Sequence, residues 1–138
     1  MPQILDRELI ERSLRRLGGL AAKAGTSYEI VVAGGAAVAL LSPGRRTTRD
    51  VDAVVITRSG TAPVRPLAEK VAGEYGLHSD WLNDGMKGFL RGVELGPVLF
   101  EGEGIIVRTF SLTQLLAMKL RAWRDEVDEA DAAVFSRS

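Results

Sequence analysis

Two carboxylates separated by one residue are the side chains of this 138-residue chain whose spacing most directly indicates chemistry. They are Asp50 and Asp52, at the start of an apolar, β-branched run that continues to Thr57. Side chains in a strand repeat every two residues, so both carboxylates point to one face, with Cα atoms roughly 6.5 Å apart. Such a pair resists burial because like charges raise each other's pKa. A divalent cation removes the conflict, and Mg²⁺ prefers one or two carboxylates plus phosphate oxygens and water.

A pair of glycines lies between a predicted buried strand and a predicted short helix. The strand is expected over residues 28–33 and the helix over residues 36–41, with Gly34 and Gly35 between them. A helix that begins here has free backbone N–H groups and a positive dipole end. Glycine also lets a phosphate approach the backbone closely. The sequence therefore predicts a phosphate site beside the metal site.

A basic segment connects the glycines to the aspartates. Within it, Arg46 and Thr48 join the face of the two carboxylates if the extended run begins before Asp50. Arginine forms fork-like contacts with phosphate, so Arg46 is the candidate triphosphate contact, with a solvated basic loop as the alternative. Thr48 is a second candidate for phosphate binding. The competing interpretation of Asp50 and Asp52 is that they cap a turn or pair with Arg46 and Arg49.

Lys119 is a further candidate, on the apolar stripe of the last predicted helix. The capping-box pattern of residues 111–114 opens that helix, and Leu115, Leu116 and Trp123 surround Lys119 at helical spacing. An unpaired ammonium is costly on such a stripe. Lys119 therefore either pairs with a phosphate or carboxylate or extends its charged end to solvent. The stripe still runs where the sequence stops, so a longer domain or another subunit is expected to cover it.

The remaining segments predict one α/β domain over residues 1–138, with a mixed β-sheet and flanking helices. The other expected elements are helices over residues 6–23 and 64–75, strands over residues 50–57, 89–93, 98–101 and 105–109, and an irregular stretch over residues 78–87.

Composition excludes several classes of function. The formal net charge is zero, so any nucleic-acid contact must be local rather than that of a general polyanion binder. The chain has no cysteine and a single histidine, which leaves thiol chemistry and a Ser/His/Asp triad without support. Its longest apolar run, residues 30–41, is too short to cross a bilayer, and the first residues lack a signal-peptide pattern. A cytoplasmic protein without a membrane partner is expected.

The ordered set of these motifs resembles the nucleotidyltransferase superfamily, which has the DNA polymerase β-like fold, and within it the AbiEii/MenT-like toxin group and its relatives. The matching features are Gly34-Gly35, the run Arg46-x-Thr48-x-Asp50-x-Asp52, the segment Trp81-Leu82-Asn83, residues 111–119, and an acid-rich helix with Asp128 and Asp131. Together they span about residues 28–131.

The resemblance implies a nucleotidyltransferase-like domain in which Asp50 and Asp52 bind Mg²⁺. It also implies that Gly34 and Gly35 contact the triphosphate of a nucleoside triphosphate and that Lys119 points toward the active site. A nucleoside monophosphate would pass to a hydroxyl of RNA, such as a tRNA 3′ end, or of a protein, with release of pyrophosphate. The protein would then be the toxin of a toxin–antitoxin system.

Two departures from the family leave a second function open. Gly35 stands where other members carry serine, and the third carboxylate expected on a later strand is replaced by Arg108. The candidate substitutes for that carboxylate are Glu101, Glu103, Asp128 and Asp131. The alternative is therefore a catalytically degenerate nucleotidyltransferase-fold protein that acts as a protein-binding module, for example toward an antitoxin. An oligomer through the last helix fits either function.

Two other nucleotide-binding folds fit poorly. The glycine segment is not G-x-G-x-x-G, and the acids open the second strand instead of closing it, which disfavours a dinucleotide-binding Rossmann unit. No Gly-Lys-Ser/Thr follows the glycines, so a P-loop is excluded.

Overall fold

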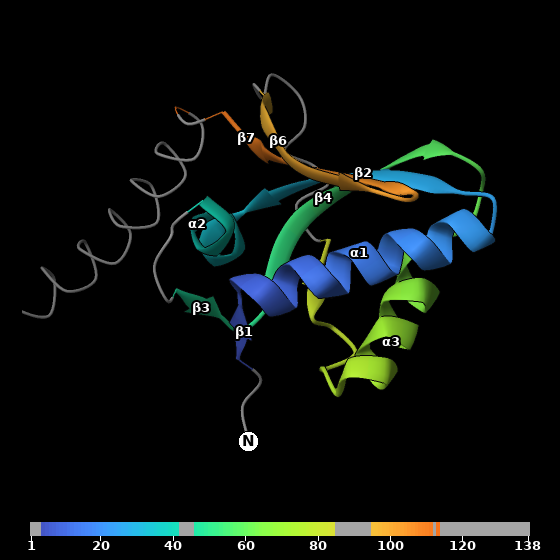
Figure 1. Ribbon diagram of the computed structural model, residues 1–138, viewed down its shortest axis with the longest axis horizontal. Helices are drawn as coiled ribbons and strands as arrows, with labels where there is room; N and C mark the ends of the chain where they lie inside the picture. Colours follow the sequence, from blue (N-terminus) through green and yellow to red (C-terminus); the bar gives the residue numbers. More distant parts are fainter. Residues whose placement is uncertain (1–3, 42–45, 85–94, 112, 114–138) are drawn as a thin grey trace, which may run out of the picture.

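A five-stranded mixed sheet, in the order β5-β4-β2-β7-β6, is the centre of the computed structural model (Figure 1). The structure describes residues 4–41, 46–84, 95–111 and 113. The strands are β2 (Ser27–Ala33), β4 (Val51–Ser59), β5 (Leu82–Asn83), β6 (Leu95–Gly102) and β7 (Ile105–Phe110). β2 pairs antiparallel with β4 and parallel with β7. β5 is parallel to β4, and β6 is antiparallel to β7. The expected α/β class, a mixed sheet flanked by helices, is confirmed.

Helices α1 (Arg7–Lys23) and α3 (Val64–Tyr75) lie together on one side of this sheet (Figure 1). The side chain of Asp6 caps α1 by accepting a 2.9 Å hydrogen bond from the backbone N–H of Leu9. α3 is followed at its C-terminus by the capping residue Gly76, which has a φ of 68°. Arg16 joins the two helices through hydrogen bonds of 2.7 and 3.1 Å to the carboxylate of Glu74.

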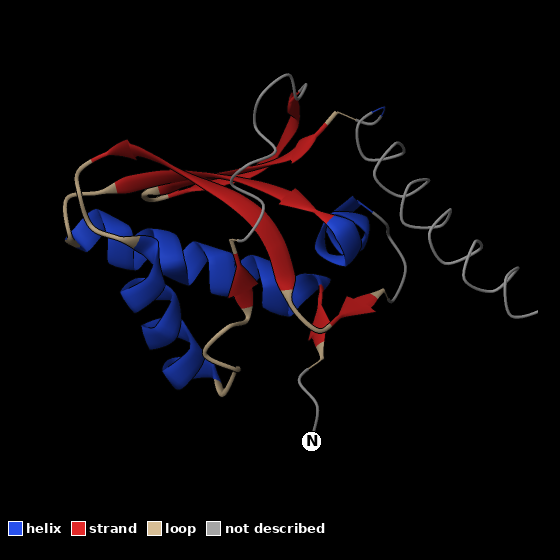
Figure 2. Ribbon diagram, turned by 180° about the vertical axis from the view of Figure 1, so that it is seen from behind, coloured by secondary structure: helices blue, strands red, loops and turns tan. Residues whose placement is uncertain are grey.

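Three short elements gather where β2 ends and β4 begins (Figure 2). They are α2 (Gly34–Leu41) and a small antiparallel sheet of β1 (Leu5–Asp6) and β3 (Thr47–Thr48). The chain bends at residues 49–50, between β3 and β4. The strand therefore begins at Val51, so Asp50 lies in the bend and not on the strand, which corrects the expectation that the two aspartates share a strand face. Arg46 and Thr48 likewise do not continue the strand face of Asp52.

Alternation along the strands separates two buried clusters. Ile30 and Val32 of β2 pack with the residues of α1 and α3, whereas Val31 belongs to a second cluster with Val54 and Phe110. Asp52 lies two residues before Val54 on β4, so its side chain is on the face opposite α1 and α3. The candidate metal ligand is thus separated from the main core by the sheet itself.

The structure agrees with most of the expected elements. Strand β5 corrects one of them, because it lies inside the stretch that was expected to be irregular. The strand expected over residues 89–93 and the last helix beyond Thr113 lie outside the described residues. In the described ranges, no helix is long and apolar enough to span a membrane.

Two adjacent glycines of α1 provide a test of how closely this helix approaches β7. A Cβ on Gly18 would lie 2.4 Å from the Glu103 carbonyl oxygen and 2.5 Å from Cγ2 of Ile105, whereas a Cβ on Gly19 would meet nothing within 4 Å. We expect Gly18→Ala to lower the free energy of unfolding by about 1–3 kcal/mol through overpacking. Gly19→Ala should raise it by about 0.5–1 kcal/mol through helix propensity. Urea unfolding measures both, and equal effects of the two substitutions would contradict the packing.

Candidate functional site

The pairing of β2 with β4 brings the glycines and the aspartates together. Ala33, the last residue of β2, lies directly opposite Asp52 in the antiparallel register. Gly34 follows with a φ of 61°, a left-handed conformation that strains any residue with a Cβ. A Cβ on Gly34 would lie 3.3 Å from Oδ2 of Asp52. The start of α2 is therefore in near contact with one oxygen of the candidate metal ligand.

Gly35 and Thr48 also lie against each other. A Cβ on Gly35 would be 2.8 Å from Oγ1 of Thr48, so a larger residue at position 35 requires a shift of the threonine. The Thr48 hydroxyl donates a 3.1 Å hydrogen bond to the backbone carbonyl of Asp50. Thr48 thus holds the bend before β4, and its expected contact with phosphate stays a prediction.

The charge environment of Asp52 suits a cation. Burial raises the pKa of Asp52, the neighbouring charge of Asp50 raises that pKa further, and a hydrogen bond from Asn83 lowers it. Neither aspartate forms an ion pair with a lysine or arginine in the part of the chain that the structure describes. The interpretation that arginines neutralise these acids therefore finds no support among the described residues. Two neighbouring carboxylates, both partly buried, are a donor set that Mg²⁺ prefers.

Asn83 is a site residue that the chemical reasoning from sequence did not identify. β5 pairs parallel to β4 with Asn83 opposite Asp52, and Nδ2 of Asn83 donates a 3.0 Å hydrogen bond to Oδ1 of Asp52. The resemblance included this residue only as part of the segment Trp81-Leu82-Asn83. A strand of two residues has no periodicity, so pattern alone could not place the amide beside the acid.

The described residues supply no third carboxylate at this site. Groups of three or more His, Asp or Glu side chains able to hold a metal are absent from residues 4–41, 46–84, 95–111 and 113. Glu101 and Glu103 lie at the β6–β7 turn, next to Ile105, which pairs with Tyr28 near the start of β2. They are therefore at the opposite end of the sheet from Asp52. The expectation that either replaces the missing acid is wrong.

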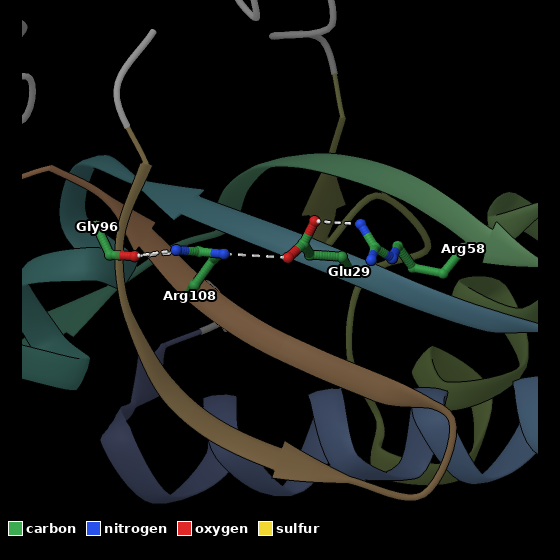
Figure 3. Close-up of polar contacts among 4 residues, drawn as sticks. All are labelled: Glu29, Arg58, Gly96 and Arg108. Atoms are coloured by element: carbon green, nitrogen blue, oxygen red, sulfur yellow. Dashed lines mark hydrogen bonds and ion pairs between the residues drawn. The ribbon is translucent and has the colours of Figure 1, made fainter.

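Arg108 has a different role from the carboxylate it replaces in the resemblance (Figure 3). Its Nη1 lies 3.3 Å from Oε2 of Glu29, whose side chain is only 8% exposed. Its Nε and Nη2 donate to the carbonyl of Gly96 at 3.0 and 2.6 Å. Arg58 contacts the other carboxylate oxygen of Glu29 at 3.4 Å. Arg108 thus neutralises a buried glutamate on β2 and joins β7 to β6.

The other predicted site residues have no described contact with Asp50 or Asp52. Arg46 is exposed just before β3, and it makes no ion pair with either aspartate. Lys119, Asp128 and Asp131 lie outside the described residues. The described chain reaches Ser111 immediately after β7, whose final residues lie beside the end of β2 because the two strands are parallel.

The raised pKa of Asp52 predicts a specific dependence of stability on pH. A carboxyl whose pKa is higher in the folded than in the unfolded chain opposes folding when it is ionised. This cost is absent below the ordinary aspartate pKa of about 3.9 and grows as the pH rises through the folded value. We therefore expect Asp52→Asn to unfold at higher urea concentration than the unsubstituted protein at pH 7 without divalent cations, and the difference to vanish toward pH 3.

Asp50→Asn is the matched comparison for this prediction. It removes only the neighbouring charge, so it should lower the pKa of Asp52 and give part of the same gain. An Asp52→Asn variant less stable than the unsubstituted protein at pH 7 would contradict the electrostatic description of the site.

Searches of protein-family models, of curated proteins and of solved structures find no match to the chain.

Proposed function

We propose that this protein is a nucleotidyltransferase of the polymerase β-like fold that uses Mg²⁺ to move a nucleoside monophosphate from a nucleoside triphosphate to a hydroxyl. The observation that carries the proposal is the position of Asp52. Its carboxylate lies beside Asp50, lacks an ion-pairing lysine or arginine among the described residues, and has one oxygen next to the glycine turn that begins α2.

The donor set supports a divalent cation rather than a monovalent or soft metal. Carboxylate oxygens are the ligands of hard cations, and Mg²⁺ usually takes one or two of them together with substrate phosphates. Asp50 and Asp52 would hold the ion. When bound, it would activate the attacking oxygen and stabilise the leaving one. The raised pKa of Asp52 supports this role, because two like charges lie together with no ion-pairing lysine or arginine among the described residues.

The glycine turn supports the phosphate side of the same reaction. The first backbone N–H groups of α2 have no partner within the helix, and its dipole favours an anion at this end. Gly34 and Gly35 would orient the triphosphate through these groups. Arg46 and Lys119 are the proposed cationic contacts, since an arginine fork or a lysine ammonium compensates phosphate charge. The chemistry of the residues thus divides into an acid pair for the cation and a glycine turn with basic side chains for the triphosphate.

The acceptor and biological context follow the resemblance. We propose an RNA hydroxyl, such as a tRNA 3′ end, or a protein hydroxyl as acceptor, and an antitoxin as the protein partner. A cytoplasmic location fits these substrates. A zero net charge limits any RNA contact to the neighbourhood of the site.

A catalytically degenerate binding module is the second candidate. The observation that favours it is the lack of a third acid beside Asp50 and Asp52 among the described residues. Such a protein would keep the fold and bind a partner protein without using the acid pair.

Nucleotide binding and transfer distinguish the two functions. We expect calorimetry with each nucleoside triphosphate to show binding that requires Mg²⁺, and α-³²P-labelled triphosphates to label total tRNA or protein. Asp50→Ala and Asp52→Ala should each reduce transfer at least about 100-fold, as expected for groups acting on charge in the transition state. Both variants should remain folded, because removal of either carboxylate relieves repulsion.

Glu103→Gln is the matched control. It removes an exposed acid at the opposite end of the sheet and should leave nucleotide binding and transfer unchanged. The enzymatic proposal is refuted if the unsubstituted protein shows no Mg²⁺-dependent nucleotide binding, or if both aspartate variants transfer nucleotide at the full rate. Either result would favour the binding module.

A further inference from the structure

The two oxygens of the Asp52 carboxylate have different surroundings. Oδ1 accepts the 3.0 Å hydrogen bond from Nδ2 of Asn83. Oδ2 is the oxygen that a Cβ on Gly34 would approach to 3.3 Å. A carboxylate can rotate about its Cβ–Cγ bond, and the bond from Asn83 opposes rotation away from this orientation. The amide on β5 therefore fixes the plane of the carboxylate so that one oxygen lies beside the glycine turn.

Strand β5 is held by α3 and by β4. The backbone N–H of Val51 donates a 2.7 Å hydrogen bond to the carbonyl of Trp81. The indole Nε1 of Trp81, which is fully buried, donates a 2.8 Å hydrogen bond to the carbonyl of Ala68 in α3. Arg65 of α3 donates at 2.9 Å to the carbonyl of Leu82 and lies 3.3 Å from the carboxylate of Asp84. The residues on both sides of Asn83 are thus fixed to the same helix.

The described contact of Asn83 connects it to Asp52 rather than to the core. Its side chain is exposed and its strand has two residues, so the amide adds nothing to the buried core. A hydrogen bond at an exposed position contributes little net stability. A polar group that orients a metal-binding carboxylate, by contrast, commonly changes metal affinity by about 10–100-fold when it is removed.

We propose that Asn83 is the positioning residue of the site. It fixes the orientation of the Asp52 carboxylate for a cation that Asp52 would hold together with Asp50, while Arg65 fixes the strand that carries the amide. This inference rests on the proposed function, since it assumes that Asp52 binds a divalent cation.

Affinity for Mn²⁺ tests the inference without any need for activity. Electron paramagnetic resonance of the free ion gives the dissociation constant for the full chain, with Mn²⁺ as the probe. We expect Asn83→Leu, which cannot donate, to weaken Mn²⁺ binding about tenfold. Asn83→Gln, which retains an amide donor, should recover most of that loss. Arg65→Met should weaken binding in the same direction and by less, because the hydrogen bond to Asp52 is retained.

Ser59→Ala, on the strand β4 that also carries Asp52, provides the matched control. It removes the 2.9 Å hydrogen bond between the hydroxyls of Ser27 and Ser59 at the other end of β4, and Mn²⁺ affinity should not change. Urea unfolding establishes that each variant is folded. Should Asn83→Leu not fold, Asn83→Ser, with a side chain too short to reach Asp52, takes its place with the same expectation.

The outcomes separate this inference from the proposed function. A folded Asn83→Leu that binds Mn²⁺ as tightly as Ser59→Ala would overturn the positioning role alone and leave the acid pair as a metal site. Failure of the unsubstituted protein to bind Mn²⁺ would overturn the proposed function and the inference that rests on it.

Discussion

The antiparallel register between β2 and β4, with Ala33 opposite Asp52, determines where the other groups of the site lie. Because β2 ends at Ala33, the next residue must leave the sheet beside the acid, and a left-handed glycine makes that turn without strain. The parallel register between β4 and β5 then places Asn83 on the other side of Asp52. Two strand pairings thus surround a single carboxylate with a glycine turn and an amide.

This arrangement has a cost in folding stability at the candidate site. Asp52 is half-buried beside a like charge, and its raised pKa indicates that the fold disfavours its ionised form. Glu29, on the same face of the sheet, is more buried and yet has two arginines. The fold therefore neutralises one buried acid internally and leaves another without a basic partner among the described residues. That contrast is the physical basis for proposing a metal-binding role for Asp52, whereas Glu29 joins neighbouring strands.

Patterns of neighbouring residues predict the helices, their ends and the buried strands, because these elements depend mainly on local sequence. The sequence predicts several such features: the apolar stripe of α1, the Asp6 cap, the β-branched runs of β2 and β4, and the helix stop at Gly76. The adjacency of Gly34 and Asp52 followed from a strand–turn–helix pattern beside an Asp-x-Asp strand. The bend at residues 49–50 was not predictable in this way, because it depends on the pairing of β3 with β1.

The missed features depend on contacts between distant parts of the chain. Asn83 reaches Asp52 across 31 positions of sequence, and Arg108 reaches Glu29 across 79. No periodicity encodes such distances, so an isolated asparagine or arginine looks like an ordinary surface residue. The sequence pattern indicates the loss of an acid at Arg108, whereas in the structure this arginine pairs with the acid Glu29.

The three charges of Glu29, Arg58 and Arg108 have a consequence for how the sheet forms. A slip of one residue in either neighbouring strand would move its arginine to the face that packs on α1 and α3, and would deprive the buried glutamate of a counter-ion. Such a misaligned sheet leaves Glu29 with one arginine and places the other against the apolar core, where an unpaired buried charge costs several kcal/mol. The carboxylate of Glu29 thus favours the correct register of β4 and β7, two strands from distant parts of the chain, against β2. Because Glu29 disfavours slipped pairings of β2 with β4, it also helps to maintain the register that places Ala33 opposite Asp52.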